Sequence, residues 1–563
     1  MFERSRSTSV PGRSALMINR RGLLAAGLAA TAVGVVGGCS GGPSGGSAGG
    51  RGGGSLDGKT KGTMKSYAVG EQFKATEPLT FTMLFQDNPA YPLKKSWEIW
   101  KDIDNLTNVT LDPTVVPYAD YDQKRSLLIS SGKAPTIIAK TYPGEESQFV
   151  GGGAILAVSD YTARMPNFTD KVKKWKLDGE IDGLRQSDGK YYVLPGLHQT
   201  LFTDYTLAIR TDVFEDEGID VPATWDDLQT ALTTLKQAKG GTPFSDRFQA
   251  DSTLNIAAAG YGTIAGWGMV SGLLFDDQSK KFYFAATTDE YRELVRYFSG
   301  LVKNGLLDPE SFTQEDDKAQ QKFVTGKSFV INTNAQTLQM YRTSMDKTLG
   351  KGKYEIAKIP VPAGPKGKLV GGSRLENGVM LSTKAADQDD FGALLQFIDW
   401  LWYSDAAQEF LKWGIKDKMW TKSGDKYELK PGYSNADYGI NPKGKIDIRH
   451  DLGFSGGNFM YGGTTAIVDS TMDDEELAWQ KVMADYQQVQ PPPGVPYTAA
   501  ERQQASLQQT PLIDAVNTET LNFILGKKPL SGWDSYVSGL KSKGLQQYVD
   551  GANKAYENAH KNS

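Results

Sequence analysis

LTFTMLFQDNP, residues 79–89, is the stretch from which the fold of this chain can be inferred. Its first seven residues are mostly aliphatic, aromatic or β-branched and predict a buried strand, and the Asp-Asn-Pro that follows predicts a turn. The next segments predict a helix, a strand, a helix and a strand, over 96–106, 110–116, 121–131 and 134–139. This alternation predicts an α/β fold, in which helices cover a parallel or mixed sheet.

The loops after these strands carry candidate binding residues. In open α/β sheets, ligands bind at the carboxyl ends of the strands. Asp87 and Asn88 follow the first strand, and Thr141 and Tyr142 follow the third. We therefore expect these residues at one edge of the sheet, facing a ligand. Turn formation is the alternative role for Asp87 and Asn88.

The same alternation continues along the chain. Strands are predicted at 191–195, 207–210, 326–333, 355–362 and 379–382, and helices at 291–304, 390–413 and 475–558, the last broken by three prolines at 491–493. Thr224 has the position of a helix N-cap, with Asp227 at the capping-box position. Trp225, between them, is expected in the core.

The N-terminal segment INRRGLLAAGLAATAVGVVGGCS, residues 18–40, predicts an export signal. Its apolar run of about 14 residues is shorter than the roughly 20 that span a bilayer. Gly37 and Gly38 before Cys39 resemble a bacterial lipobox, which implies that Cys39 takes a diacylglyceryl group and becomes the mature N-terminus. An ordinary signal peptide with a chance cysteine is the alternative.

The export route and the start of the chain stay open. Arg20 and Arg21 are similar to a twin-arginine signal, but Sec export fits the same residues. Met1 and Met17 both fit a translation start. Residues 39–76 predict a flexible linker, because Gly and Ser dominate its first half. A linker of this kind matters when the folded part must reach something at the membrane.

Composition limits the class of function. The chain has 62 basic and 66 acidic residues, a net charge of −4, so a nucleic-acid partner, which needs a basic face, is not expected. A hydrophobic content of 39% over 563 residues fits a globular protein of two lobes or more. Cys39 is the only cysteine, so an internal disulfide cannot form. With 3 histidines, no zinc site is expected, nor any other metal or cofactor.

Several short segments resemble the extracellular solute-binding proteins, family 1, of ABC importers, and among them the large, oligosaccharide-binding lipoproteins. The segments are SGKAPTII (131–138), GAIL (153–156), DGKYYVLP (188–195), RTDVF (210–214), PATW (222–225), VKNGLLDP (302–309), TGK (325–327), FILGK (523–527) and WDSY (533–536). Each segment is short, so their order along the chain carries the resemblance.

The resemblance implies a two-lobe periplasmic-binding-protein type II fold. Mixed sheets flanked by helices form each lobe, and hinge crossovers let the lobes close on a ligand. The implied boundaries are a signal peptide at 1–38, the lipidated linker at 39–76, one lobe at 77–202 and 363–415, and a second lobe at 203–362 and 416–563 that includes the C-terminal helices. Crossovers are expected near 203–210 and 356–362, and another return after 390–413.

The resemblance also implies a function. The chain is expected to be a monomeric receptor, anchored to the outer face of the cell membrane, that captures a carbohydrate and delivers it to an ABC permease without catalysis. Aromatic faces suit sugar rings, and Asp, Asn and Arg suit their hydroxyls. The residues that match the pockets of sugar-binding relatives, or that face the expected cleft, are Asp87, Asn88, Tyr142, His198, Asp204, Trp267, Asn332, Asn334, Arg374, Glu376, Asn377, Asn458 and Tyr461.

Other classes of function fit the sequence less well. A binder of peptides or of another non-sugar solute is the first alternative, and a glycosidase with a carboxylate pair is the second. GFSGG at 453–457 matches a nucleophile elbow, but the flanking residues do not predict its strand and helix. Residues 236–243, where some large relatives carry a calcium loop, lack a carboxylate. GKS at 326–328 lacks the first glycine of a P-loop.

Overall fold

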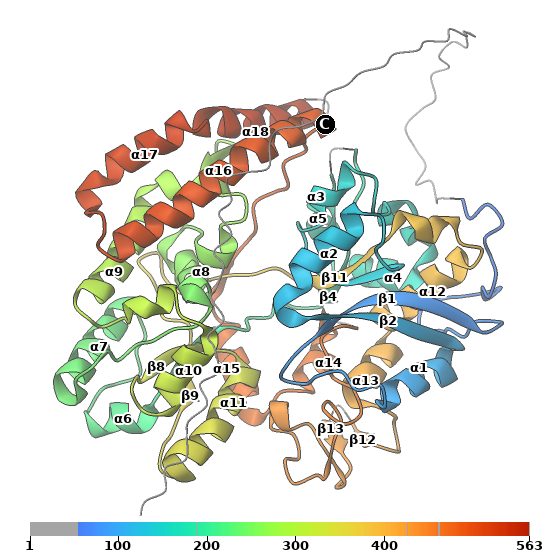
Figure 1. Ribbon diagram of the computed structural model, residues 1–563, viewed down its shortest axis with the longest axis horizontal. Helices are drawn as coiled ribbons and strands as arrows, with labels where there is room; N and C mark the ends of the chain where they lie inside the picture. Colours follow the sequence, from blue (N-terminus) through green and yellow to red (C-terminus); the bar gives the residue numbers. More distant parts are fainter. Residues whose placement is uncertain (1–54, 187, 425, 460–461, 562–563) are drawn as a thin grey trace, which may run out of the picture. The chain divides into compact units, whose positions relative to one another are not determined.

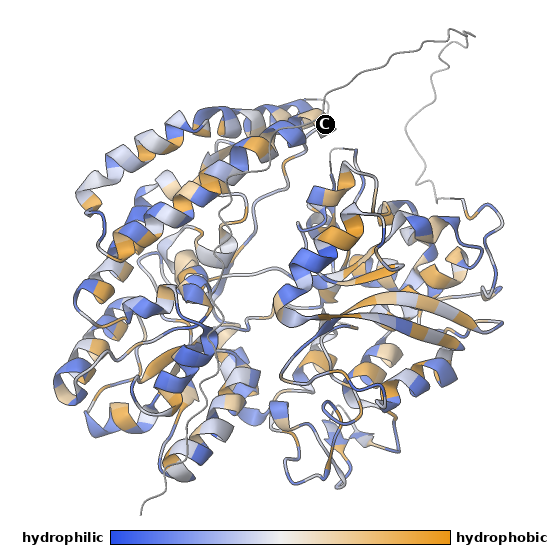
Figure 2. Ribbon diagram, viewed as in Figure 1, coloured by the Kyte–Doolittle hydropathy of each residue, from blue (hydrophilic) through white to orange (hydrophobic). Residues whose placement is uncertain are grey.

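The structure is a computed structural model that describes residues 55–186, 188–424, 426–459 and 462–561. These residues lie in one compact unit, Gly52–Ser563. Within it, two large and separate apolar cores form. The chain therefore folds into two lobes, drawn mainly in blue, teal and orange and in green, yellow and red (Figure 1). Figure 2 shows apolar and polar residues alternating along the helices, which is typical of helices with one buried side.

The first lobe is built on a six-stranded sheet. Its strands are β1 (Leu79–Asp87), β2 (Val109–Pro117), β3 (Ile137–Thr141), β4 (Leu194–His198), β11 (Leu375–Leu381) and β16 (Gly462–Gly463). Their order is β16–β4–β11–β3–β1–β2. β11 is antiparallel to both of its neighbours, whereas the other pairs are parallel. The sheet is mixed, as the sequence predicts.

Helices and two small strand pairs complete the first lobe. They are α1 (Glu98–Thr107), α2 (Tyr121–Ser130), α3 (Ser147–Val150), α4 (Pro166–Lys174), α5 (Asp178–Asp182), α12 (Phe391–Tyr403), α13 (Asp405–Trp413), α14 (Thr465–Asp469), β12 (Trp420–Ser423) with β13 (Lys426–Leu429), and β14 (Tyr433–Ser434) with β15 (Ile446–Asp447). Every residue of α12 except Gln396 is buried. A helix that is apolar all round belongs inside a core, so α12 is the central helix of this lobe.

The second lobe has a smaller antiparallel sheet, of β5 (Thr206–Ile209), β8 (Val330–Thr333) and β9 (Ala357–Lys358). Side chains of a strand alternate between its two faces. Leu207 and Ile209 accordingly enter the larger core, while Ala208 enters a smaller core with residues of α10 (Asp316–Val324) and α11 (Ala335–Met345). Helices therefore cover both faces of this sheet, which is the expected α/β arrangement.

The remaining elements of the second lobe surround its larger core. They are α6 (Thr211–Asp216), α7 (Trp225–Lys239), α8 (Asp251–Tyr261), α9 (Asp289–Lys303), the hairpin β6 (Leu273–Asp276) with β7 (Lys281–Phe284), α16 (Ala499–Ile524), α17 (Trp533–Ser542) and α18 (Leu545–His560). Thr224 and Asp227 form the predicted capping box at the start of α7. Trp225 is 1% exposed, which confirms its predicted place in the core.

Three segments cross between the lobes. The first, 199–205, joins β4 to β5, and the second, 359–374, joins β9 to β11. The third, 470–473, joins α14 to α15 (Asp474–Met483). Near them, β10 (Leu369–Gly371) pairs in parallel with β17 (Gln487–Val489). The crossings are held by a small core of their own: Val361, Val370, Trp479, Met483 and Tyr486.

The lobe boundaries differ from those expected from the resemblance in two places. The described residues within 416–467 pack in the first core rather than the second, because Trp420 and Tyr427 lie against Trp413 of α13, with ring centroids 6.2 and 5.4 Å away. The described part of the expected linker, 55–76, also packs on the first lobe, where Phe73 is fully buried. Apolar residues are sparse in segment 55–76, so its composition alone predicts a linker.

Asp399, on α12, is a buried carboxylate that fixes this N-terminal segment. It accepts hydrogen bonds from the Tyr67 hydroxyl at 3.0 Å, from the backbone N–H groups of Asn167 and Phe168 at 3.0 and 2.8 Å, and from the Asn167 amide at 2.7 Å. Burial raises the pKa of Asp399 to about 6, although these bonds act in the opposite direction. The Asp399 carboxylate thus joins α12, the first turn of α4 and the segment around Tyr67.

Tyr67→Phe tests that role. We expect the free energy of unfolding to fall by about 1.5–3 kcal/mol, the usual contribution of a hydrogen bond to a charged group, because the carboxylate loses a donor. Urea unfolding of the folded chain measures the change. Tyr283→Phe, in an exposed tyrosine of β7, is the matched control and should leave stability unaltered. Equal stability of the two variants would contradict the role given to Tyr67.

Candidate functional site

An aromatic group stands on the second lobe next to the first crossing. The rings of Tyr205, Phe248 and Trp267 contact one another: Trp267 lies 5.3 Å from Tyr205 and 5.0 Å from Phe248, centroid to centroid. Tyr205 and Phe248 are 6.1 Å apart. Trp267 is 43% exposed, although a large apolar ring is usually buried. An exposed ring that contacts two others through edge-on and tilted packing is held in place and can offer an apolar face to a ligand.

The backbone around Phe248 is unusual. Phe248, Gln249 and Ala250 have φ values of 54°, 54° and 65°, in the left-handed region that glycine normally occupies. The turn is held because the Phe248 N–H donates to the Asp316 carboxylate at 2.7 Å and the Ala250 N–H donates to the Arg247 carbonyl at 2.9 Å. Strain of this kind, at about 1–2 kcal/mol per residue, concentrates at ligand sites.

Gln249→Gly is expected to relieve part of this strain. Gln249 is exposed, so its side chain contributes little packing, and we expect unfolding free energy to rise by about 1 kcal/mol. Ligand affinity should fall at the same time, because a freer turn presents Phe248 and Arg247 less rigidly. Thermal unfolding and calorimetric titration measure the two effects. Gln249→Ala keeps the strain and is the control; a Gly variant that behaves like the Ala variant would refute the prediction.

The first lobe contributes exposed aromatic residues to the same region. Tyr118 and Tyr142, which are 53% and 47% exposed, follow the carboxyl ends of the parallel strands β2 and β3. Burial is the main cause that raises the pKa of Tyr205, and Asp204, Tyr142 and Tyr118 add to it. Tyr205, at the end of the first crossing, therefore lies within electrostatic reach of both first-lobe tyrosines. The exposed tyrosines of the first lobe and the aromatic group of Tyr205, Phe248 and Trp267 thus border one region, which we call the interlobe site.

A buried arginine supports the first-lobe side of the interlobe site. The guanidinium of Arg449 lies 3.7 Å from the Tyr91 ring centroid and 5.3 Å from that of Tyr438, and it pairs with Asp437 at 2.9 Å. Burial alone would lower the pKa of Arg449, but Tyr438, Tyr91 and Asp437 raise it more. Arg449 stays charged and contacts both rings, so it positions these tyrosines, although its Nε has no hydrogen-bond partner among the described residues.

Two carboxyl groups, those of Asp204 and Glu376, lie near the interlobe site. Asp204, on the first crossing, accepts a hydrogen bond from the Asn334 amide at 3.1 Å. Glu376, on β11, is 29% exposed and lies 3.9 Å from His198. Burial raises the pKa of both carboxyls, and Asp204 raises that of Glu376 further. A charge on Asp204, on the crossing, therefore acts on the Glu376 carboxyl of the first lobe.

Arg247 and Asn332 form a buried polar pair behind Phe248. The Arg247 Nε–H donates to the Asn332 side-chain oxygen at 3.2 Å, and the guanidinium lies 4.5 Å from the centroid of the Phe248 ring. The Asn332 N–H donates to Asp246 at 3.1 Å, and burial raises the pKa of Asp246 to about 6. Arg247 Nη2 and Asn332 Nδ2 are buried donors without a partner among the described residues. Such donors are costly unless something binds them.

Some predicted residues are used locally instead. Asp87 accepts from the Leu93 N–H at 2.7 Å and Asn88 from the Ala90 N–H at 2.9 Å, which are turn-forming bonds. The Asn458 side chain both accepts from and donates to the backbone of Gln86, at 2.8 and 2.9 Å. Asn458 thereby clamps the end of β1 against its own loop.

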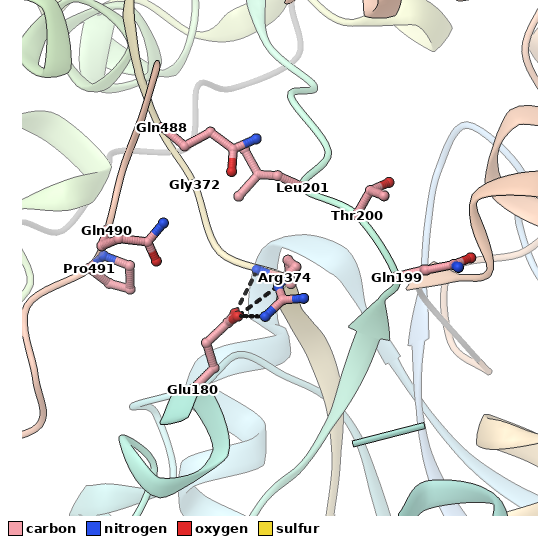
Figure 3. A pocket seen from close by; sticks show the side chains of 9 residues that line it. All are labelled: Glu180, Gln199, Thr200, Leu201, Gly372, Arg374, Gln488, Gln490 and Pro491. Atoms are coloured by element: carbon pink, nitrogen blue, oxygen red, sulfur yellow. Dashed lines mark hydrogen bonds and ion pairs between the residues drawn. The ribbon is translucent and has the colours of Figure 1, made fainter. Parts of the chain in front are cut away.

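The hinge holds other predicted residues. A hollow of about 370 Å³ is lined by Glu180 of α5 and by residues of the crossings and of 488–491, which Figure 3 shows converging on it. Arg374 lies there, where its guanidinium bonds Glu180 and the carbonyls of Trp175 and Lys176. His198 lines a neighbouring hollow of about 460 Å³ and stacks on Phe202; burial lowers the pKa of His198 to about 4.

Of the predicted residues, Tyr142, Asp204, Trp267, Asn332 and Asn334 are thus brought together at the interlobe site. Asn377 is buried beside Glu376, to which its amide donates at 3.4 Å. Tyr461 and Cys39 lie outside the described residues. The residues that the sequence did not indicate are Tyr91, Tyr118, Lys140, Tyr205, Arg247, Phe248, Tyr438 and Arg449.

The structure argues against the nucleophile-elbow alternative. Ser455 follows no strand directly and precedes no helix within 453–459, although its φ of 58° is left-handed. Its hydroxyl accepts from the Asn435 amide at 3.2 Å, and no described histidine forms a hydrogen bond with it. Among the described residues there is no group of three or more His, Cys, Asp or Glu that could hold a metal ion. The helices described include none with the length and apolar character to cross a bilayer.

Comparison with known proteins decides the family. Residues 98–419, more than half of the chain, match the bacterial extracellular solute-binding protein family. The chain belongs to this family. A solute-binding protein works outside the cytoplasm, which agrees with the export signal predicted from the sequence.

Individual relatives are distant from this solute-binding protein. It is 23% identical to YtcQ of Bacillus subtilis, a polygalacturonan/rhamnogalacturonan-binding protein, over 82% of this chain and 88% of YtcQ. It is 24% identical to FusA of Streptococcus pneumoniae, a fructooligosaccharide ABC transporter substrate-binding protein, over 53% of this chain and only 56% of FusA. The crystal structure of the alginate-binding protein AlgQ2 superposes with a TM-score of 0.68 at 18% identity, covering 86% of this chain and 99% of AlgQ2. The two-lobe α/β fold expected from the sequence is confirmed.

Proposed function

We propose that this solute-binding protein is the substrate receptor of an ABC importer and that it captures a carbohydrate, most of all an oligosaccharide, between its lobes. The observation that carries the proposal is the set of exposed aromatic rings, Tyr118 and Tyr142 from one lobe and Trp267 from the other, around carboxylate and amide groups. Flat rings cover the C–H faces of sugars, while the polar groups bond their hydroxyls. The ligands for which YtcQ, FusA and AlgQ2 are named are all carbohydrates, which supports the same class here.

Hinge closure is the event that a permease would recognise. The aromatic and polar groups come from both lobes, so a ligand that contacts both would favour the closed form over the open one. The receptor would release its ligand unchanged to the permease. Anchoring through the diacylglyceryl group on Cys39, and action as a monomer, complete the proposal.

Calorimetric titration against a panel of oligosaccharides tests the ligand class. We expect saturable binding of at least one oligosaccharide and none of control peptides. Binding of peptides alone would favour the non-sugar alternative. Long incubation with the bound oligosaccharide, followed by product analysis, tests the glycosidase alternative, for which the Asp204 and Glu376 carboxylates are the candidate pair. Recovery of the intact oligosaccharide is expected, and cleaved product would overturn the receptor role.

Lipid anchoring is tested separately. The full-length protein, expressed in a host that processes lipoproteins, should partition into detergent, while Cys39→Ala should partition into water. Equal partitioning of the two would contradict the anchor without affecting the ligand assignment.

A further inference from the structure

We propose that the interlobe site accepts a neutral, hydroxyl-rich glycan and rejects glycans that carry carboxylates. This inference rests on the proposed function and adds the charge of the ligand to it. The names of YtcQ and AlgQ2 point to polygalacturonan and alginate, which are polymers of uronic acids. Identity of 23% and 18% does not carry their ligand charge to this chain, so the charges within its own site must decide.

The carboxyl groups of Asp204 and Glu376 are partly accessible to a ligand. Asp204 is partly exposed and Glu376 is 29% exposed, and among the described residues no lysine or arginine lies within salt-bridge distance of either. His198, at 3.9 Å from Glu376, has its pKa lowered to about 4 and is neutral at pH 7. Two partly exposed carboxyl groups outside any salt bridge with lysine or arginine form hydrogen bonds with sugar hydroxyls, and a negative charge on either one repels a further carboxylate.

Two cations near the site, Arg449 and Lys358, are paired with carboxylates. The Arg449 side chain is 4% exposed and pairs with Asp437. Lys358, whose charge acts on Asp204, is held by Glu476 at 2.8 and 2.9 Å, and its side chain is 1% exposed. Binding of a uronate would need an accessible arginine or lysine, and these cations are covered by their partners.

Two further cations lie nearer the ligand position. Arg247 is 8% exposed, lies over the Phe248 ring and bonds Asn332 through Nε; its Nη2 has no partner among the described residues but is itself buried, so the guanidinium presents little accessible charge to a ligand. Lys140 is partly buried, and burial lowers the pKa of its ammonium. Tyr91, Glu376 and Tyr118 act in the opposite direction, whereas Arg449 lowers the pKa further. The charges of Lys140 and Glu376 therefore act on each other and partly cancel. Asp204 remains as the group that a ligand carboxylate would meet.

Oligogalacturonides and their fully methyl-esterified forms are matched probes, because esterification removes the charge and keeps the sugar chain. They are titrated calorimetrically beside neutral gluco-, galacto-, xylo- and fructo-oligosaccharides, at low and at physiological salt. We expect saturable binding of at least one neutral oligosaccharide, with little dependence on salt. Any binding of the charged form should be at least about a hundredfold weaker than that of its ester.

Asp204→Asn and Glu376→Gln are the diagnostic variants. Each should weaken binding of the neutral glycan by about tenfold and should narrow the gap between the charged and esterified forms, since one repulsive charge is gone. Thermal unfolding of each variant checks that it folds. Charged oligogalacturonide that binds as tightly as its ester would overturn the inference while leaving the carbohydrate receptor intact. Binding of no glycan of either kind would overturn the proposed function and this inference with it.

Discussion

Glu476→Gln is expected to lower the free energy of unfolding by about 3–5 kcal/mol, because it leaves a buried lysine without its counter-charge. Glu476 of α15 and Lys358 of β9 are 4% and 7% exposed, and the ammonium donates to both carboxylate oxygens at 2.8 and 2.9 Å. The same ammonium lies 3.5 Å from the centroid of the Trp479 ring. Burial lowers the pKa of Lys358 and raises that of Glu476, and each partner opposes the shift of the other.

The position of this pair makes the loss larger than a local one. Gln480 donates to Glu476 at 2.8 Å and to the carbonyl of Thr203 on the first crossing at 2.6 Å. The Trp479 indole N–H donates to the carbonyl of Ile359, where the second crossing begins, at 2.8 Å. The buried pair therefore holds α15 against two crossings, and its loss should loosen the hinge as well as the second lobe.

Urea unfolding at pH 7 measures the effect. Glu519→Gln is the matched control, because Glu519 pairs with Lys528 at 2.6 Å where the lysine is 52% exposed, and exposed pairs contribute about 0–1 kcal/mol. The double variant Lys358→Met with Glu476→Met should recover most of the stability, since an apolar pair of similar volume needs no counter-charge. A Glu476→Gln variant as stable as the Glu519→Gln control would show that the pair does not hold the crossings.

The parts of the fold that could be predicted have a local signal. β1 begins at Leu79, as expected, because its apolar run ends in an unmistakable turn sequence. β4 was predicted at 191–195 but lies at 194–198. All eight residues from Tyr191 to His198 are buried, so no alternation of polar and apolar residues was present to set the strand ends. A strand that is buried on both faces has no such alternation, so the sequence does not show where it begins and ends.

The site could be predicted only where a residue follows a strand or a helix cap. Tyr142 follows β3 and Asn334 is the N-cap of α11, and both contribute to the interlobe site. Arg247 and Phe248 could not be found, since their positions depend on a left-handed turn that contains no glycine. Asn88 and Asn458 have side chains suited to sugars, but these side chains form hydrogen bonds with nearby backbone groups instead. Residue type cannot distinguish these two uses.

The double variant Trp267→Ala with Tyr142→Ala is expected to weaken binding of the best oligosaccharide by about 3 kcal/mol, roughly 150-fold. The two rings come from different lobes, so a sugar held between them loses contact on both sides at once. Each single variant should lose about half of that free energy, unless closure of the hinge requires both rings, in which case each should lose nearly all of it. Calorimetric titration of the two single variants and the double variant distinguishes the cases.

Stability should change little in these variants, which separates binding from folding. Trp267 and Tyr142 are 43% and 47% exposed, so truncation removes mainly surface that a ligand would cover. Tyr283→Ala, in a tyrosine of β7 that is 38% exposed, is the control and should leave affinity unchanged. If the double variant binds the oligosaccharide within about threefold of the unaltered chain, less than 1 kcal/mol, the aromatic rings are not the sugar platform. The ligand would then have to be held by the polar groups alone, and Asp204→Asn and Glu376→Gln would cause the larger losses.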